Sequence, residues 1–242
     1  MKKRAKKFKP TPKKFHPKSL TLLYEDYDIL VIEKPSALLT MSNDRERDKT
    51  AYAYLNDYVR KGVAKSRNRV FIVHRLDRET SGVLVFAKHE EAKSYLQQEW
   101  SHFEKSYYAV VHGNLAQKEG TFTSYLAENG VHKMYSTKDS KKGKLSQTSY
   151  QVIKETKDYS LLKINLLTGR KHQIRVHLAD HGHPVVGDKK YGAGEKGVKR
   201  LTLHAASLTL THPFSKETMT FNTEIPPYFE SFMKGASRLP TP

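Results

Sequence analysis

The apolar residues of this chain fall in short runs bounded by polar turns, as is typical of β-strands. The runs at residues 71–73 and 83–87 are apolar without alternation, which indicates strands covered on both faces. Residues 121–126, 144–153 and 160–167 then follow one another with polar turns between them. Because consecutive strands with short connections usually pair in opposite directions, we expect a sheet that is largely antiparallel.

Helical spacing marks a smaller part of the chain. Residues 50–60 and 89–102 carry apolar side chains three and four positions apart, which predicts two helices. Strands are expected again at residues 201–210 and 218–223, before a short last helix. Together these elements predict an α+β fold: a mixed, largely antiparallel β-sheet flanked by helices, in one catalytic domain at residues 20–242.

The charge balance limits the classes of partner. The 242 residues include 43 Lys and Arg against 25 Asp and Glu, a formal net charge of +18. Such a chain attracts polyanions, so nucleic acid is the first partner to consider. The absence of cysteine excludes disulfides, thiolate catalysis and Cys-ligated zinc. With no apolar run of about 18 residues and no signal peptide, we expect a cytoplasmic protein that binds no membrane.

The basic residues are concentrated at the amino terminus. Nine of the first eighteen residues are Lys or Arg, interrupted by Pro10, Pro12 and Pro17. A segment this poor in aliphatic side chains cannot fold by itself, so residues 1–19 are expected to form a flexible basic arm. The arm is either a solvated tail or a segment that binds phosphates. The second is favoured because counterion release gives a cationic tail affinity for nucleic acid.

The stretch HRLDRETSG at residues 74–82 places one carboxylate, Asp77, between Arg75 and Arg78. It lies between the two uninterrupted apolar runs, so Asp77 is expected in a loop held by buried strands. Loops on a rigid scaffold are a common location for catalytic side chains. Asp77 is therefore the first candidate for a catalytic residue.

A second group of functional residue types lies in the stretch TGRKHQIRVHL. Gly169 ends a strand, and the pattern that follows is helical, with Gly182 at a position that ends helices. Arg170, His172 and Arg175 then lie near the positive amino end of this helix, where like charges are unfavourable unless an anion is bound. A phosphate or a carboxylate would suit this position; the alternative is that Arg175 is a solvated cation.

HRLDRETSG, EKSYYAVVHG and TGRKHQIRVHLADHGHPVVGDKKYG together resemble the three central motifs of the RluA-type pseudouridine synthases. The earlier stretch LLYEDYDILVIEKPSALLTM resembles the opening strand pair of that family, with its Lys-Pro step. The four motifs occur in the family's order between residues 22 and 227. The chain resembles the compact form of the family, in which no separate folded RNA-binding domain precedes the catalytic domain.

The resemblance implies an enzyme that isomerises uridine within RNA to pseudouridine and uses no metal or other cofactor. Asp77 then matches the family's essential aspartate, which acts as a nucleophile or stabilises the detached intermediate. Arg175 matches the arginine that pairs with this aspartate and favours its ionised form. Tyr107 matches the tyrosine whose ring lies against the target uracil, and the alternative is a tyrosine of the core.

Five further residues are candidates for binding the RNA substrate. Arg75 matches the arginine that enters the space left by a flipped-out base, and the alternatives are phosphate binding or anchoring of the loop. Ile174 matches the aliphatic floor of the uracil pocket or is plain core. His74 is expected to orient the catalytic loop by hydrogen bonding. Arg170 and His172 complete the set at the start of the helix.

Two other classes of function fit the sequence less well. Four histidines between residues 172 and 183 suggest a metal hydrolase, but HExxH is absent and no set of carboxylates completes a metal site. An RNA-binding protein or chaperone on the same fold would have lost catalytic residues that are all present here. We expect a monomer that acts on structured RNA, with ribosomal RNA slightly favoured over transfer RNA. Residues 41–49 and 61–69 are candidate contact loops or solvated surface.

Overall fold

The computed structural model describes residues 8–238 apart from 10, 45, 64, 193–196 and 236. The chain forms two compact units: Met1–Trp100 with Thr211–Phe221 is unit 1, and Ser101–Leu210 with Asn222–Pro242 is unit 2. In the described residues each unit combines antiparallel strands with α-helices, so the predicted α+β fold is confirmed. The predicted boundary between arm and catalytic domain stays a prediction.

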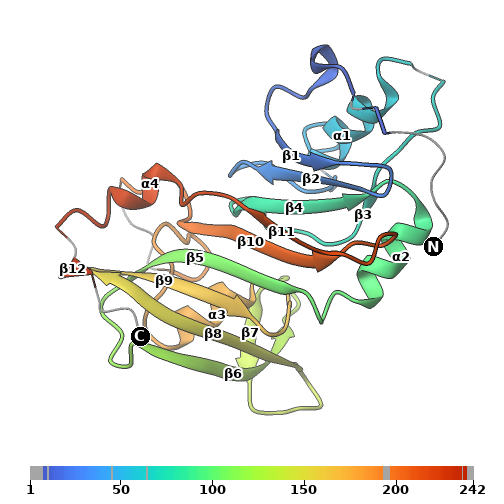
Figure 1. The fold of residues 1–242 in the computed structure, drawn as a ribbon. Helices are drawn as coiled ribbons and strands as arrows, with labels where there is room; N and C mark the ends of the chain where they lie inside the picture. The colour runs from blue at the N-terminus through green and yellow to red at the C-terminus, as the bar shows by residue number, and fades with distance from the viewer. Residues whose placement is uncertain are drawn as a thin grey trace. The chain divides into compact units, whose positions relative to one another are not determined.

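Unit 1 contains an antiparallel sheet built on two buried strands (Figure 1). Its strands are β1 (Thr21–Glu25), β2 (Ile29–Lys34), β3 (Phe71–Ile72) and β4 (Ser81–Ala87). β2 pairs with β1 on one side and with β4 on the other, where Lys34 lies opposite Gly82. β3 pairs with the end of β4. All of β4 is buried, as the uninterrupted apolar run predicts.

The ends of β2 have clear local causes. Before the strand, Asp26 Oδ1 accepts hydrogen bonds from the backbone N–H groups of Asp28 (2.8 Å) and Ile29 (2.9 Å). This side chain therefore shapes the turn between β1 and β2. After the strand, Pro35 has no N–H to donate to the sheet, and β2 ends at Lys34.

The helices of unit 1 are α1 (Ala51–Arg60) and α2 (Glu90–Gln98). Thr50 caps α1, because its Oγ1 accepts a hydrogen bond from Ala53 N–H at 3.0 Å. The helix ends at Lys61, which has a left-handed φ of 53°. α2 contacts β3 and β4. The prediction of a helix at residues 50–60 is confirmed, whereas α2 is shorter than the predicted 89–102 because the chain leaves the helix at Glu99.

Unit 2 contains a larger antiparallel sheet. Its strands are β5 (Glu104–His112), β6 (Glu119–Glu128), β7 (Met134–Thr137), β8 (Lys144–Glu155), β9 (Tyr159–Leu166), β10 (Leu203–Thr211) and β12 (Ser237–Arg238). Within this unit the strand order is β10-β5-β9-β8-β6-β7, with β12 beside β8. β11 (Thr218–Asn222) belongs almost entirely to unit 1. The sequence did not predict the short strands β7 and β12.

Helices α3 (Gln173–Asp180) and α4 (Pro227–Glu230) also belong to unit 2. α3 contacts β6, β7 and β8 (Figure 1). Its Ile174 joins a buried cluster against which Tyr107 packs. Phe229 of α4 joins a different cluster, against which Tyr108 packs. The side chains of these neighbouring tyrosines of β5 thus pack on opposite faces of the sheet. In the described residues, no helix is long and apolar enough to cross a membrane.

The described residues of the amino-terminal arm pack on unit 1. Thr11 is buried, and the ring of His16 meets the ring of Tyr58 edge-on at a centroid distance of 5.3 Å. A short 3-10 helix, η1 (Lys13–Phe15), lies between them. The predicted flexibility of residues 1–7 and 10 concerns positions outside the described residues.

Candidate active site

Asp77 lies in the loop between β3 and β4, and both of its sequence neighbours are held through their main chain. The Thr40 hydroxyl donates to Leu76 O (2.9 Å) and accepts from Leu76 N–H (3.2 Å). The Lys34 ammonium donates to Arg78 O (3.2 Å). Asp77 is therefore fixed at a point where the chain is anchored on either side.

Lys34, the last residue of β2, is fully buried. In addition to the loop carbonyl, its ammonium donates to Pro35 O (2.9 Å) and Leu38 O (2.7 Å), so three acceptors match its three protons. Burial lowers the pKa of Lys34 to about 7, while the negative charges of Asp77 and Glu79 act in the opposite direction. The ammonium that holds the loop thus also interacts electrostatically with the candidate catalytic carboxylate.

His74 and Arg75 stand at the start of the same loop. His74 Nε2 accepts a hydrogen bond from Val85 N–H of β4 (3.2 Å), and its ring stacks on Trp100 at a centroid distance of 4.2 Å. These contacts connect the loop to the sheet. Arg75 is exposed, with Nη1 3.7 Å from Met41 Sδ. Its proposed entry into the base stack of RNA stays a prediction.

In unit 2, the start of α3 is fixed by the side-chain amide of Gln173. Its Oε1 accepts from the Thr168 hydroxyl (2.8 Å) and from Arg170 N–H (3.0 Å). Its Nε2 donates to Gln147 O and to Thr148 Oγ1, both at 2.9 Å. All hydrogen-bonding positions of the amide are used, which ties the TGR loop and the helix to β8.

Arg175, on the first turns of α3, forms a buried bidentate ion pair with Asp188. Arg175 Nε lies 2.7 Å from Asp188 Oδ2, and Nη2 lies 2.8 Å from Oδ1. The guanidinium also lies over the Tyr191 ring, 5.2 Å from its centroid. Burial raises the pKa of Asp188, but Arg175 and the backbone N–H groups of Lys190 and Tyr191 lower it below its usual value. The predicted pairing of Arg175 with Asp77, a residue of unit 1, stays a prediction.

Tyr107 and Ile174 lie in one region of unit 2. Ile174 is 4% exposed inside the buried cluster, and the half-buried Tyr107 packs against that cluster. On β5, Tyr107 pairs with Ile164 of β9 and with Ala205 of β10. The two residues predicted to contact the uracil are thus associated with the same apolar cluster of unit 2.

Arg170 and His172 lie just before α3. Arg170 is exposed, and its Nε donates to Leu145 O (3.3 Å). His172 has a left-handed φ of 54°, and its Nδ1 lies 2.7 Å from the Tyr191 hydroxyl. That hydroxyl also accepts a hydrogen bond from Met134 N–H (3.1 Å), so Tyr191 connects the start of α3 to β7.

His177 illustrates why the histidines of the TGR motif are poor metal ligands. Its Nδ1 lies 2.8 Å from the Thr148 hydroxyl and its Nε2 lies 2.9 Å from the Ser124 hydroxyl. Burial, with a smaller effect of His181, lowers the pKa of His177 to about 4. The ring is therefore neutral at physiological pH and uses both nitrogens to connect α3 to β8 and β6.

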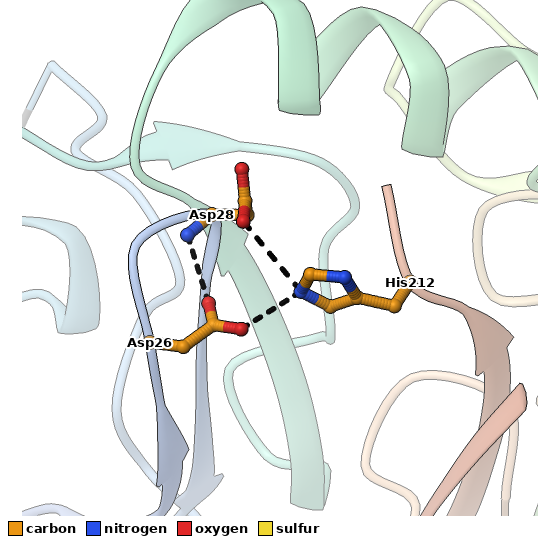
Figure 2. A group of neighbouring side chains, drawn as sticks. All are labelled: Asp26, Asp28 and His212. Atoms are coloured by element: carbon orange, nitrogen blue, oxygen red, sulfur yellow. Dashed lines mark hydrogen bonds and ion pairs between the residues drawn. The ribbon is translucent and has the colours of Figure 1, made fainter. Parts of the chain in front are cut away.

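Among the described residues, Asp26, Asp28 and His212 bring their possible ligand atoms within 4.8 Å of one another. Figure 2 shows His212 Nε2 facing both aspartates, 2.8 Å from Asp26 Oδ2 and 3.8 Å from Asp28 Oδ2. His212 Nδ1 accepts from the backbone N–H groups of Phe214 and Ser215, so Nε2 carries the proton and donates it to Asp26. The nitrogen that faces the carboxylates has no lone pair for a metal, and the group acts as a hydrogen-bonded contact within unit 1.

Four residues that support the site were not found from the sequence: Lys34, Thr40, Asp188 and Tyr191. For Lys34 a signal was present, because a lysine that ends the apolar strand ILVIEK is either exposed or has buried acceptors. Asp188 and Tyr191 lie in the stretch GDKKYG, which carries part of the family resemblance without indicating a role. Nothing in the sequence marks Thr40.

The fold of this chain is shared with solved RNA pseudouridylate synthase domains. The structure of human RNA pseudouridylate synthase domain containing 4 superposes with a TM-score of 0.74 at 23% identity, over 88% of this chain and 92% of that chain. Human RNA pseudouridylate synthase domain containing 1 superposes with a TM-score of 0.69 at 26% identity, over 94% of this chain and 91% of that chain. An RNA-modifying enzyme fold is the class that these similarities define.

Sequence comparison identifies the family. The model of the RNA pseudouridylate synthase family matches residues 28–180. The dual-specificity RNA pseudouridine synthase RluA of Yersinia pestis is 37% identical over 212 residues, which cover 85% of this chain and 98% of that protein. The uncharacterized RNA pseudouridine synthase YjbO of Bacillus subtilis is 35% identical over 224 residues, 90% of this chain and 77% of that protein. The chain belongs to the RNA pseudouridylate synthase family and is an RNA pseudouridine synthase of the RluA type.

Proposed function

We propose that this synthase isomerises specific uridines in structured RNA, with ribosomal RNA slightly favoured over transfer RNA. The observation that carries the proposal is the loop of Asp77, in which hydrogen bonds to both neighbouring residues fix the position of one carboxylate. A relative named ribosomal large subunit pseudouridine synthase D, from Borreliella burgdorferi, is 30% identical over 88% of this chain, which supports the ribosomal choice. The enzyme is taken to be a cytoplasmic monomer without metal or other cofactor.

In the proposed reaction Asp77 is the nucleophile: its carboxylate forms a transient bond to the sugar or to the base of the target uridine, and this bond breaks again before the product is released. The bond between N1 of uracil and C1′ of the ribose breaks, and C1′ forms a new bond to C5 of the same uracil. N1 gains a proton and C5 loses one, so the product is an isomer of the substrate. An ionised carboxylate is required at this step, and a nearby guanidinium or ammonium favours that form.

Arg175 is proposed to supply part of that positive charge by pairing with Asp77. The bidentate pair with Asp188 and the contact with the Tyr191 ring fix the orientation of the guanidinium. Its positive charge would favour the ionised form of a neighbouring carboxylate. Tyr107 is proposed to lay its ring against the uracil and to assist proton movement at C5, with Ile174 as the floor of the pocket.

Base flipping is the proposed route by which the uracil reaches these residues. Removing a stacked base from folded RNA costs a few kcal/mol, so a side chain that fills the vacated space lowers the cost. The exposed Arg75 is proposed for this task because a planar guanidinium can stack as a base does. His74 is proposed to orient the loop that carries it, and Arg170 and His172 to contact the RNA backbone.

The test is pseudouridine mapping by carbodiimide labelling and primer extension, on ribosomal and transfer RNA from cells that lack the gene. The cells are complemented with wild type, with Asp77→Asn or with Asp57→Asn, a matched change on the exposed side of α1. We expect one or a few sites to be restored by wild type and Asp57→Asn and to stay absent with Asp77→Asn. Residual activity of Asp77→Asn at a tenth of wild type would contradict the nucleophile assignment.

A further inference from the structure

A cavity lies in unit 1, and none of the candidate catalytic residues lines it. It is a cavity of about 680 Å³, a volume typical of ligand sites. Three parts of the chain line it: the amino-terminal arm; the end of β1 with the turn after it and the residue after β4; and the end of α1 with the loop after it. The charged and aromatic residues of the lining are Phe8, Lys9, Glu25, Tyr27, Lys61, Arg69 and Lys88.

The charges around this cavity are unbalanced. Lys9, Lys61, Arg69 and Lys88 face a single acid, Glu25. Lys88 Nζ lies 2.8 Å from Glu25 Oε1, and the Tyr58 hydroxyl donates to Oε2 at 2.6 Å, so the charge of Glu25 is already matched. In the described part of the chain, no carboxylate forms an ion pair with the remaining three cations. The cavity therefore favours an anionic occupant.

Aromatic surface accompanies the positive charge. The rings of Phe8 and Tyr27 meet edge-on at a centroid distance of 5.3 Å, and Lys88 Nζ lies 4.5 Å from the centroid of the Phe8 ring. Tyr27 is 37% exposed, so part of its ring is accessible to a ligand. Cations combined with accessible aromatic rings are the means by which proteins bind unpaired nucleotides, through phosphate contacts and base stacking.

The arm that closes the cavity is anchored on unit 1. Thr11 is buried, and the ring of His16 packs edge-on against the ring of Tyr58 on α1. Farther along, a Cβ on Gly62 would lie 3.3 Å from the Phe15 ring, so the arm passes close to the turn that carries Lys61. The arm is thus held close to the turn that carries Lys61, and Phe8 and Lys9 line the same cavity as Lys61 and Arg69.

We propose that this cavity binds an unpaired nucleotide of the RNA substrate, with its phosphate near Lys9, Lys61 and Arg69 and its base against Phe8 or Tyr27. This role rests on the proposed function and extends it to a second RNA contact. The cavity lies at the Lys88 end of β4, whereas the Asp77 loop enters the opposite end of this strand. Seven residues at about 3.3 Å each separate the two ends by roughly 20 Å. The bound nucleotide therefore lies several positions away from the target uridine.

The test compares two double variants that remove the same charge. Lys61→Asn with Arg69→Gln changes the cavity, and Asn is chosen because Lys61 has a left-handed φ of 53° that asparagine tolerates. Lys157→Asn with Lys154→Gln changes exposed or half-exposed positions of unit 2 as the control. Each protein is titrated over a range of salt concentrations with two RNAs: a minimal stem-loop around the modified uridine, and the same RNA extended by about ten nucleotides on each side.

We expect the cavity variant to bind the extended RNA more weakly than the control variant does. Its plot of log affinity against log salt should be shallower by about 1.4, which is 0.7 for each lost phosphate contact with a single strand. On the minimal RNA the two variants should be indistinguishable. Equal behaviour of the two variants on the extended RNA would overturn the proposal, as would competition by polyglutamate as effective as competition by RNA of equal charge.

The experiments distinguish a failure of the proposed function from a failure of the second RNA contact. If wild type forms no pseudouridine in either RNA, the proposed function fails, while total ribosomal RNA still serves as the ligand for the salt titration. If wild type is active and the cavity variant binds every RNA as the control does, the proposed function stands and the second RNA contact is wrong. Far-UV circular dichroism of each variant confirms that the comparison is made between folded proteins.

Discussion

Replacing Lys34 by methionine tests whether the hydrogen bonds of its ammonium position the loop of Asp77 as well as stabilise the fold. Methionine has a similar length and an apolar end, so it fills the buried space without the ammonium. The change removes the hydrogen bonds to Pro35, Leu38 and Arg78, with donor–acceptor distances between 2.7 and 3.2 Å. The last of these anchors the residue that follows Asp77.

Two opposing contributions determine the change in the free energy of unfolding. Hydrogen bonds to a charged group contribute about 1.5–3 kcal/mol each, so three of them contribute roughly 4.5–9 kcal/mol. Burial opposes this, because a fall in the pKa of Lys34 from 10.5 to about 7 corresponds to about 5 kcal/mol against the charged form. The net contribution is then roughly 0–4 kcal/mol, and we expect Lys34→Met to destabilise the protein by about 2 kcal/mol.

The rate of pseudouridine formation should fall by more than a loss of about 2 kcal/mol in unfolding free energy would explain, because the variant is still folded under the assay conditions. A displacement of about 1 Å at a catalytic group can cost on the order of a hundredfold in rate. We expect single-turnover pseudouridine formation by Lys34→Met to fall at least this far, at a temperature where urea titration shows the protein to be folded. Lys163→Met, on the exposed side of β9, is the control and should change neither quantity appreciably.

The pH dependence gives a second readout. Between pH 7 and 10.5 the unfolded chain binds a proton at Lys34 that the folded protein lacks, so folding stability increases with pH in this window. The difference in unfolding free energy between wild type and Lys34→Met should therefore increase from pH 6.5 to 9.5. If Lys34→Met keeps its activity within twofold, and the difference in unfolding free energy from wild type does not change with pH, the hydrogen bonds of Lys34 do not position the loop of Asp77.

Three further predictions concern unit 2. Asp188→Asn leaves the buried guanidinium of Arg175 without its counter-charge and should destabilise the protein by about 3–5 kcal/mol in urea unfolding; a loss below 1 kcal/mol would contradict the importance of this pair. Tyr107→Phe keeps the ring and should lower the single-turnover rate without changing RNA affinity, and an unchanged rate would exclude the hydroxyl from proton movement. Because burial lowers the pKa of His177 from 6.5 to about 4, the unfolded state binds the proton first and stability should fall by about 3 kcal/mol as the pH decreases through this window; His177→Asn should flatten the curve, and an unaltered curve would show that another group causes it.

Local patterns were sufficient to predict the elements that carry the site. The uninterrupted apolar run at residues 83–87 became the buried strand β4, and the polar stretch before it became the loop of Asp77. Gly182 lies just after α3 with a φ of 80°, as a glycine that ends a helix should. These features depend on neighbours in sequence, so the sequence contains the information to predict them.

Contacts between distant segments were not predictable in the same way. Thr40 and Leu76 are 36 residues apart, and an isolated threonine gives no sign that its hydroxyl will hold a loop from another part of the chain. Asp188 lies 13 residues after Arg175, a separation that no helix or strand period relates to it. The strand β7 was missed because four residues with one buried side chain provide too little pattern.

In the proposed function, the charged groups of Asp77 and Arg175 need not rearrange during the reaction, because neighbouring residues already hold them in place. Lys34 holds the loop by donating hydrogen bonds to three carbonyl groups, one of which belongs to the residue after Asp77. Arg175 is held differently, by the carboxylate of Asp188 and the ring of Tyr191. Groups that are already oriented stabilise a developing charge without paying for reorganisation at the moment of reaction. In the proposed function these fixed groups bind the uracil, which every target uridine shares. We therefore expect the choice of RNA to depend on surfaces that lie away from the loop of Asp77.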